Sequence, residues 1–299
     1  MKTGWKAASI LCALVVLPAL YVWNSGRQAR PAIGEGRTLA LADHEVRYYL
    51  HGKGETVVLL ASLGRSASDF NELAVTLAGA GFRTVAVELR GIGGSTGSGM
   101  FKKLTQHDYA SDAAAVIRGL EDRSGRVHVI GHAYGNRIAR TLAADSPELV
   151  KSVTLIAAGG YVPIPGDIRK AMYLIFFNFL PDRVRERYIR EAFFAPGNAI
   201  PEHWVRGWYF RASWPQSRAT LRTPREQWWG GGTAPILLLQ GENDRIAPRE
   251  NADIMKKEFG DRVTVVTIPR AGHAMLPEQG GLIERAIVPF LKKQRRGPA

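Results

Sequence analysis

Short, unbroken apolar runs alternate along the chain with segments in which apolar residues recur at helical spacing. Residues 57–60 (Val-Val-Leu-Leu) contain no polar position and are bounded by Gly54 and Ser62, which is typical of a strand buried on both faces. Residues 109–121 instead repeat apolar side chains with a period of 3.6, which predicts a helix. This alternation predicts a parallel sheet whose strands are joined by right-handed helical crossovers.

The remaining elements of the sheet and its helices follow from the same two patterns. We expect a hairpin at 38–41 and 46–50, further strands at 83–87, 127–130, 153–156, 235–240 and 263–268, and helices at 69–78, 249–259 and 281–293. Another helical pattern starts directly after Gly135.

The pattern changes between residues 161 and 232, where aromatic residues and arginines gather. This stretch holds five of the seven tryptophans, and it shows helical periodicity at 167–180 and 183–194 but no strand pattern. It interrupts the sheet at the edge formed by the carboxyl ends of the strands, where ligands of open α/β sheets bind. We therefore expect a core at 37–160 and 233–299, with 161–232 inserted as a helical cap.

The amino-terminal residues have the pattern of an export signal. Lys2 and Lys6 precede an apolar run at 7–23, and a helix of that length spans about 25 Å, close to the thickness of a bilayer core. Because no clean pair of small residues for signal peptidase follows the run, an uncleaved signal anchor is favoured over a removed signal peptide. The protein is therefore expected to be membrane-anchored or exported, with residues 1–25 in a bacterial-type inner membrane, 26–36 as a linker and the folded domain outside the cytoplasm.

The charge and composition narrow the range of partners. The 299 residues carry a net charge of +13, but the basic residues are scattered apart from a cluster at 292–296, and no nucleic-acid-binding motif is present. A solvated basic surface is therefore favoured over nucleic-acid binding. No group of His, Cys and carboxylate residues has the spacing of metal ligands, and the only cysteine, Cys12, precedes the folded domain. We expect a small-molecule partner with no metal and no cofactor, while the oligomeric state does not follow from the sequence.

Residues 127–139 join a strand to a helix through a tight Gly-x-x-x-Gly turn. Gly131 and Gly135 let the backbone bend sharply and let the strand and the helix pack closely. The residue at the apex is then held in a strained conformation, with its side chain pointing out of the turn. In enzymes with a Gly-x-Ser-x-Gly elbow this residue is the nucleophile, whereas here it is Ala133, which has no nucleophilic atom.

The order of these elements resembles that of the α/β-hydrolase superfamily over residues 37–294. After the elbow at 131–135, Gly-Glu-Asn-Asp at 241–244 stands where the family carries its acid, and Ala-Gly-His at 271–273 where it carries its histidine. The loop at 88–95 resembles the family's D-x-R-G-x-G-x-S, with Glu in place of Asp. The resemblance implies an α/β-hydrolase fold, with a mostly parallel central sheet flanked by helices and a helical cap inserted before the acid-bearing strand.

The resemblance also assigns roles to individual residues. His273 would be the general base or acid, and Asp244 would hold its ring in the right tautomer and stabilise its protonated form. The oxyanion hole would use the backbone N–H groups of Tyr134 and of Leu63 or Gly64. The chain departs from the family here as well, since Ala-Ser replaces the His-Gly pair that precedes this loop, but backbone amides survive a change of side chain.

The aromatic residues of the cap are expected to have two compatible roles. Burial of such rings would fold the cap onto the core, and some of them, among which we select Phe176, Trp204 and Trp208, would face the cavity as an apolar substrate-binding surface.

Three explanations account for an alanine at position 133. One is an engineered Ser-to-Ala variant of a serine hydrolase, a second is an enzyme in which the His273–Asp244 pair acts directly, and a third is an inactive protein that only binds a ligand. The second is favoured because a binding protein has no need of a paired His and Asp. Its substrate would be a small, largely apolar ester, lactone, epoxide or ketone-like compound.

Other residues near the turn are weaker candidates for chemistry. Ser62, Ser95 and Tyr134 are substitute nucleophiles, but hydrogen bonding within loops for the serines and packing for the tyrosine are favoured. His132 is expected to pack rather than to act as a second base.

Overall fold

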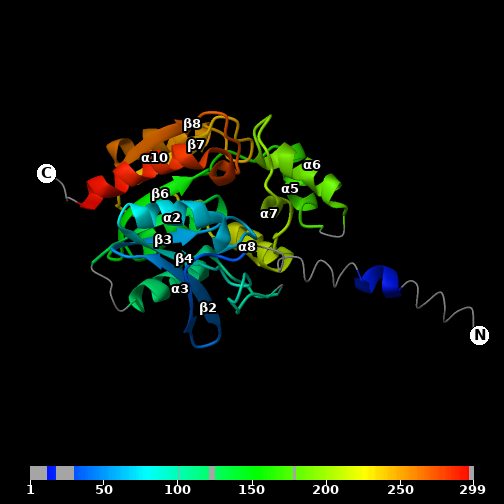
Figure 1. Cartoon of the computed structure of the whole chain (residues 1–299), viewed down its shortest axis with the longest axis horizontal. Coiled ribbons are helices and arrows are strands. Elements are labelled where there is room, and N and C mark those ends of the chain that lie inside the picture. Colours follow the sequence, from blue (N-terminus) through cyan, green and yellow to red (C-terminus); the bar gives the residue numbers. More distant parts are fainter. Residues whose placement is uncertain (1–11, 18–29, 100, 121–124, 178–179, 296–299) are drawn as a thin grey trace, which may run out of the picture.

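The computed structural model describes residues 12–17, 30–99, 101–120, 125–177 and 180–295. Eight strands form one sheet in the order β1-β2-β4-β3-β5-β6-β7-β8 (Figure 1). The strands are β1 (Glu35–Ala40), β2 (Glu45–Gly52), β3 (Glu55–Leu60), β4 (Phe82–Val87), β5 (Val127–His132), β6 (Val150–Ile156), β7 (Ile236–Gly241) and β8 (Val263–Ile268). The β1–β2 and β2–β4 pairs are antiparallel and the other five pairs are parallel, so the predicted mostly parallel sheet is confirmed.

Burial along the strands follows their place in the sheet. Every residue of β5 and β7 is buried, because these interior strands have helices on both faces and neighbours on both sides. At the edge, β8 is buried at its two ends and partly exposed between them, although its sequence is as apolar as that of the interior strands.

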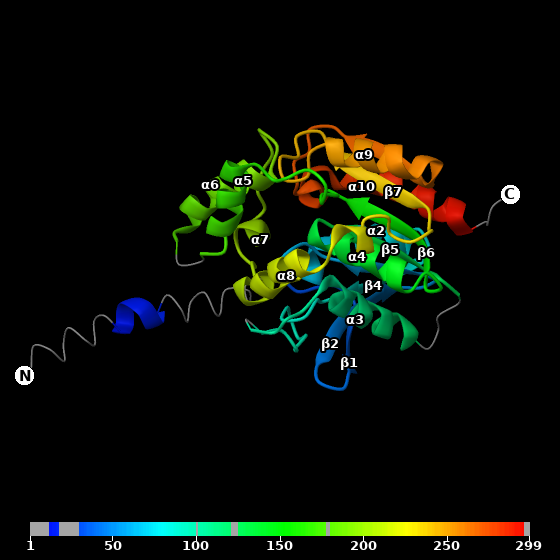
Figure 2. The same ribbon diagram turned by 180° about the vertical axis from the view of Figure 1, so that it is seen from behind.

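Helices cover both faces of the sheet and enclose two apolar cores. On one face lie α2 (Asn71–Gly79) and α10 (Met275–Arg295), with the short 3-10 helix η2 (Ala67–Phe70) before α2 (Figure 1). On the other lie α3 (Gln106–Arg118), α4 (Tyr134–Asp145) and α9 (Glu250–Phe259) (Figure 2). The central strands are therefore buried on both sides, which is what their unbroken apolar sequences require.

The insertion between β6 and β7 is helical. It contains α5 (Gly166–Leu174), α6 (Asp182–Phe193), α7 (Glu202–Val205), α8 (Phe210–Arg222) and the 3-10 helix η3 (Arg225–Gln227). Its apolar side chains form a third core, which lies at the end of the molecule where α5, α6 and α7 are seen in Figure 2. The α/β-hydrolase architecture with a helical cap before the acid-bearing strand is thereby confirmed.

The helices of the insertion differ from the prediction in three places. The helix predicted at 167–180 ends at Leu174 as α5, and neither α7 nor α8 was predicted. Pro215, a residue that usually breaks a helix, is tolerated inside α8. The range Met275–Arg295 consists of two helical segments separated by a kink at Gln279, whose φ of −138° and ψ of 39° are not helical, and the second segment agrees with the helix predicted at 281–293.

The predicted signal anchor falls mostly outside the described residues. Of residues 1–25 only 12–17 are described, and they are helical. Among the helices that the structure does describe, none is both long and apolar enough to cross a bilayer. The anchor, the linker at 26–29 and the membrane localisation stay predictions.

Close backbone packing fixes the turn between β5 and α4. A Cβ on Gly135 would overlap the carbonyl oxygen of Leu60 at the end of β3, and one on Gly131 would overlap the carbonyl oxygen of Gly135. Between the two glycines, Ala133 has φ 51° and ψ −109°, a left-handed conformation that strains a residue with a Cβ. Its N–H donates to the carbonyl oxygen of Ile156 at 2.9 Å, which ties the turn to the end of β6.

A buried carboxylate joins two loops at the same edge of the sheet. Glu88, directly after β4, accepts hydrogen bonds from the Ser66 hydroxyl at 2.7 Å and from the Ala67 N–H at 3.0 Å. It is 2% exposed, and burial raises its pKa from 4.5 to about 7, with a further contribution from the nearby Asp69. Glu therefore fills the place of the family's Asp as a bridge to the loop after β3.

We predict that Gly135→Ala destabilises the fold by about 3 kcal/mol, because the new methyl group meets backbone that cannot move without displacing β3. Gly79→Ala, at the end of α2 where a Cβ meets nothing within 4 Å, should be neutral or gain up to about 1 kcal/mol. Urea unfolding of the two variants and the parent measures the difference. Equal stability of the two variants would show that the turn is not closely packed.

We predict that Glu88→Gln removes a pH-dependent penalty on folding. Below pH 4.5 the carboxyl is protonated in both states; between pH 4.5 and 7 the folded state keeps a proton that the unfolded state releases, so stability falls as the pH rises. Above pH 7 the buried carboxylate lowers the free energy of unfolding by about 3 kcal/mol, which corresponds to the rise of its pKa from 4.5 to about 7. Gln mimics the protonated side chain and does not titrate. The free energy of unfolding of Glu88→Gln, minus that of the parent, should therefore increase by about 2–3 kcal/mol between pH 5 and pH 8. The exposed Glu226→Gln is the control, and parallel curves for Glu88→Gln and the parent would contradict the buried-proton account.

Candidate active site

The structure brings His273 and Asp244 together at the carboxyl edge of the sheet. The Nδ1 atom of His273 lies 2.9 Å from Oδ2 and 3.1 Å from Oδ1 of Asp244, and both residues are buried. An Nδ1 that donates to a carboxylate carries the ring proton, which leaves the lone pair of the neutral ring on Nε2. Within the described residues, Nε2 of His273 has no hydrogen-bond partner, so it is available to a ligand or to water.

The Asp244 carboxylate is oriented by its own loop. Its Oδ1 also accepts hydrogen bonds from the N–H groups of Ile246 at 2.9 Å and Ala247 at 2.8 Å. Asp244 is therefore both a turn residue that binds its own backbone and the partner of His273. The backbone donors hold the carboxylate in place.

The elbow contacts the histidine loop directly. The Nε2–H of His132 donates to the carbonyl oxygen of His273 at 2.8 Å, and the two ring centres are 5.7 Å apart. Burial lowers the pKa of His132 to about 4, with the neighbouring His273 as the next contribution, so His132 is neutral near pH 7. His132 thus packs, as predicted, and in addition ties the backbone of His273 to the elbow.

Ala133 and Leu63 are the partly exposed points of this region. Ala133 stands between the buried His132 and Tyr134, and Leu63 between the buried Ser62 and Gly64. Solvent therefore reaches the two positions at which the family's chemistry would take place.

Backbone donors are available at both positions predicted for the oxyanion hole. The Tyr134 N–H lies in the first turn of α4, where backbone donors have no acceptor within the helix. The Leu63 N–H has no acceptor among the described residues, whereas the Gly64 N–H donates to Oε1 of Gln216 at 2.8 Å. The structure therefore favours Leu63 over Gly64 as the second donor, a choice that the sequence leaves open.

The three cap aromatics selected from the sequence lie in one buried cluster. Trp204 is fully buried, and its ring centre lies 5.6 Å from that of Trp208 and 6.4 Å from that of His132. Phe176 packs edge-on against Trp208 at 5.5 Å. These contacts show that the three residues pack together inside the cap. A substrate-binding role for them stays a prediction.

The substitute nucleophiles have structural contacts. Ser95 donates to the carbonyl oxygen of Glu88 at 2.7 Å and accepts from the N–H of Arg47 at 2.8 Å. The Tyr134 hydroxyl is buried, and burial raises its pKa well above the ordinary value, so it is a poor source of phenolate. Ser62 is buried directly after β3.

Sequence reasoning missed the residues that hold the histidine loop against the cap. The N–H of Ala274 donates to the carbonyl oxygen of Phe193 at 2.8 Å, at the end of α6. Glu278 accepts from the N–H groups of Gly272 at 2.8 Å and Ala195 at 2.6 Å. An acidic residue five positions after His273 was the available signal, but only the fold shows that the cap chain passes beside it.

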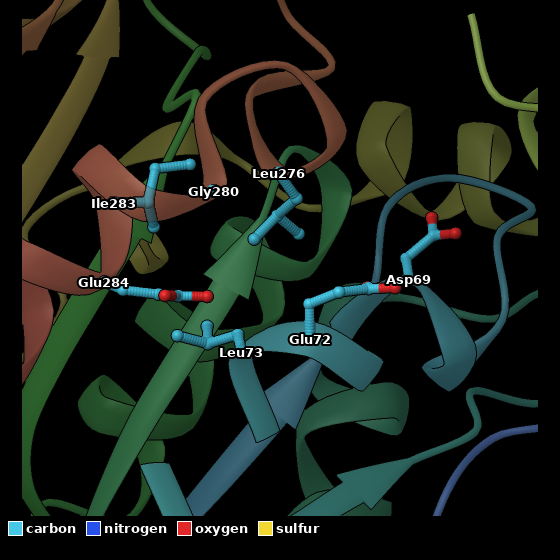
Figure 3. Close-up of a pocket in the computed structure, with 7 residues that line it drawn as sticks. All are labelled: Asp69, Glu72, Leu73, Leu276, Gly280, Ile283 and Glu284. Atoms are coloured by element: carbon cyan, nitrogen blue, oxygen red, sulfur yellow. The ribbon is translucent and has the colours of Figure 1, made fainter. Parts of the chain in front are cut away.

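The pocket drawn in Figure 3 lies elsewhere. It is a shallow depression between α2 and α10, and neither Ala133, Asp244 nor His273 lines it. Its lining consists of Asp69, Glu72, Leu73, Leu276, Gly280, Ile283 and Glu284. In the part of the chain that the structure describes, no group of three His, Cys, Asp or Glu side chains is arranged to hold a metal ion.

Known proteins are similar to this chain in sequence and in fold. A protein of Variovorax paradoxus, provisionally named as the carbamate hydrolase RutD, is 26% identical over 268 residues, which are 83% of this chain and 96% of that protein. The 2-(acetamidomethylene)succinate hydrolase of Mesorhizobium japonicum is 26% identical over 259 residues, or 80% of this chain and 89% of that enzyme. A crystal structure of E-2-(acetamidomethylene)succinate hydrolase superposes with a TM-score of 0.70 at 22% identity, over 86% of this chain and 99% of the other.

The sequence profile described as the alpha/beta hydrolase family matches residues 50–285, which include the elbow, the cap, the acid loop and the histidine loop. The chain therefore belongs to the α/β-hydrolase family.

Proposed function

We propose that this protein is a hydrolase in which the His273–Asp244 pair activates a water molecule directly, without a covalent intermediate on residue 133. The observation that carries the proposal is the bond from His273 Nδ1 to a carboxylate held by two backbone amides, with Nε2 left unpartnered among the described residues. A ring held in this way is prepared to take a proton at Nε2 and to be stabilised as it becomes charged.

The methyl group of Ala133 determines which nucleophile is used. A serine hydroxyl at this apex would accept the substrate's acyl group, whereas a methyl group leaves room for a water molecule and cannot react. The partial exposure of Ala133 in an otherwise buried turn supports access of that water.

The reaction then needs no group beyond the chain, the substrate and water. A water molecule gives one proton to Nε2 of His273 while its oxygen attacks the carbonyl carbon, and the electron pair of the C=O bond moves to the carbonyl oxygen. The N–H groups of Leu63 and Tyr134 stabilise that oxyanion. When the C=O bond re-forms, the bond to the leaving group breaks, and the leaving group takes the proton from His273.

The surroundings of the site indicate a small, largely apolar substrate. Leu63 packs against the aromatic cluster of the cap, and an apolar substrate suits such a surface. Esters and lactones fit this site and the step above. The names of two relatives add a carbamate and an acetamido compound to the classes that should be tested.

We predict that His273→Ala lowers kcat/KM at least about 100-fold on any substrate that the parent turns over, because the base is lost. The control is His107→Ala, since His107 forms a similar pair with Asp145 at 2.7 Å on α3, outside the site. A panel of small esters, lactones, carbamates and amides supplies the substrate. Unchanged turnover in His273→Ala would sink the proposed mechanism, and a parent that is stabilised by ligands without turnover would be a binding protein.

We predict that the parent is not labelled by a fluorophosphonate probe and that Ala133→Ser is labelled. The new hydroxyl would lie at the apex next to His273 and the two backbone donors, as in serine hydrolases. Gel fluorescence with intact-mass measurement gives the site occupancy. Labelling of the parent would mean that another residue is the nucleophile, and an unlabelled Ala133→Ser would mean that the base or the oxyanion donors are misplaced.

A further inference from the structure

Arg65, a buried arginine, follows Leu63 and Gly64 in the loop after β3. Arg65 is 2% exposed, and its Nε and Nη2 bind the two carboxylate oxygens of Asp69 at 2.9 and 2.6 Å. The pair is bidentate, so the planar guanidinium is fixed in orientation as well as in charge.

The remaining donors of Arg65 bind the cap. Nη1 donates to the carbonyl oxygens of His203 at 3.1 Å and Arg206 at 3.2 Å, and Nη2 makes a further bond of 3.1 Å to His203. All five N–H groups of the guanidinium therefore have acceptors. Three of the five bonds reach α7 and the residue after it, which belong to the cap.

Two indole rings complete the surroundings of this guanidinium. Its central carbon lies 4.4 Å from the ring centre of Trp204 and 4.7 Å from that of Trp208. The two rings are nearly perpendicular, so the cation occupies the corner between them. The same Trp204 packs against His132 of the elbow, which places Arg65 behind the site rather than in contact with a substrate.

The loop next to Arg65 has two further bonds to the cap. The Gly64 N–H donates to Gln216 on α8 at 2.8 Å, and the Gly64 carbonyl oxygen accepts from the N–H of Tyr209 at 2.9 Å. Gly64 has φ 61°, and a Cβ there would come within 3.1 Å of Ser213 and of the Tyr209 carbonyl oxygen. Cap and loop are therefore packed backbone to backbone, and the direction of the neighbouring Leu63 N–H depends on these bonds.

We propose that Arg65 is the positioning residue of the oxyanion loop, and that it sets the Leu63 N–H by fastening this loop to the closed cap. The role rests on the proposed function, because it concerns the oxyanion hole of that mechanism. Closure of α7 and α8 and assembly of the hole are then one event, since an open cap would remove three of the five hydrogen bonds of the guanidinium and both partners of Gly64.

The test uses the full chain with Ala133→Ser as the reference and a fluorophosphonate as the probe. Arg65→Lys keeps the positive charge but loses the fork, because an ammonium group has three donors on one nitrogen and cannot make the bidentate bond to Asp69 together with the three bonds to the cap. We expect the maximal labelling rate to fall at least about tenfold with little change in the probe concentration for half-maximal rate. Gln216→Asn, whose shorter side chain does not reach Gly64, should give a smaller fall of the same kind.

The matched control is Arg262→Lys. Arg262 likewise binds two carbonyl oxygens, of Ala234 and Gly230, and lies 4.8 Å from the ring of Phe259, but it stands just before β8 at the edge of the sheet, and neither carbonyl belongs to α7 or α8. Its labelling rate per folded molecule should equal that of the reference. Hydrogen–deuterium exchange should also show faster exchange in both 62–66 and 203–216 for Arg65→Lys and in neither for Arg262→Lys.

The outcomes distinguish failure of the proposed function from failure of the positioning role of Arg65. A reference that is not labelled would overturn the proposed function and the role of Arg65 with it. A labelled reference whose rate is unchanged by both Arg65→Lys and Gln216→Asn would overturn the positioning role alone. A rate that falls only in proportion to the folded fraction, as in a purely structural role, would also overturn it.

Discussion

The site depends on a steric constraint between backbone atoms. The carbonyl oxygen of Leu60 lies where a side chain on Gly135 would be, so α4 can approach β3 only through glycine. This approach forces Ala133 into its left-handed conformation, sets the first-turn N–H of Tyr134 beside it and brings His132 within 2.8 Å of the histidine loop. The strained turn is therefore fixed by packing, although the residue at its apex is an alanine.

The cap also holds two loops at the carboxyl edge of the sheet. It holds the histidine loop through the Phe193 carbonyl and the Ala195 N–H, and it holds the loop after β3 through Arg65 and Gly64. Both loops thus take their positions partly from a segment that contributes none of the proposed reacting groups.

The sequence predicted the fold well because its signals are local. Unbroken apolar runs identified β3 and β7, and the glycine spacing around Ala133 identified the turn. The pairing of His273 with Asp244 followed from the family resemblance. The cap contacts of Arg65 were not predictable, since the carbonyl oxygens of His203 and Arg206 lie 138 and 141 positions later in the chain. The raised pKa of Glu88 was equally hidden, because burial of a carboxylate depends on loops that no local pattern places.

Direct attack by water, without an acyl-enzyme, is the central claim, and a rapid-quench experiment tests it most directly. The enzyme is mixed with the best ester of the panel, quenched with acid within the first turnover, and its intact mass is measured together with released product. We predict that product appears while the protein keeps its unmodified mass at every time point. A transient increase by the mass of the acyl group would show a covalent intermediate and would contradict the account.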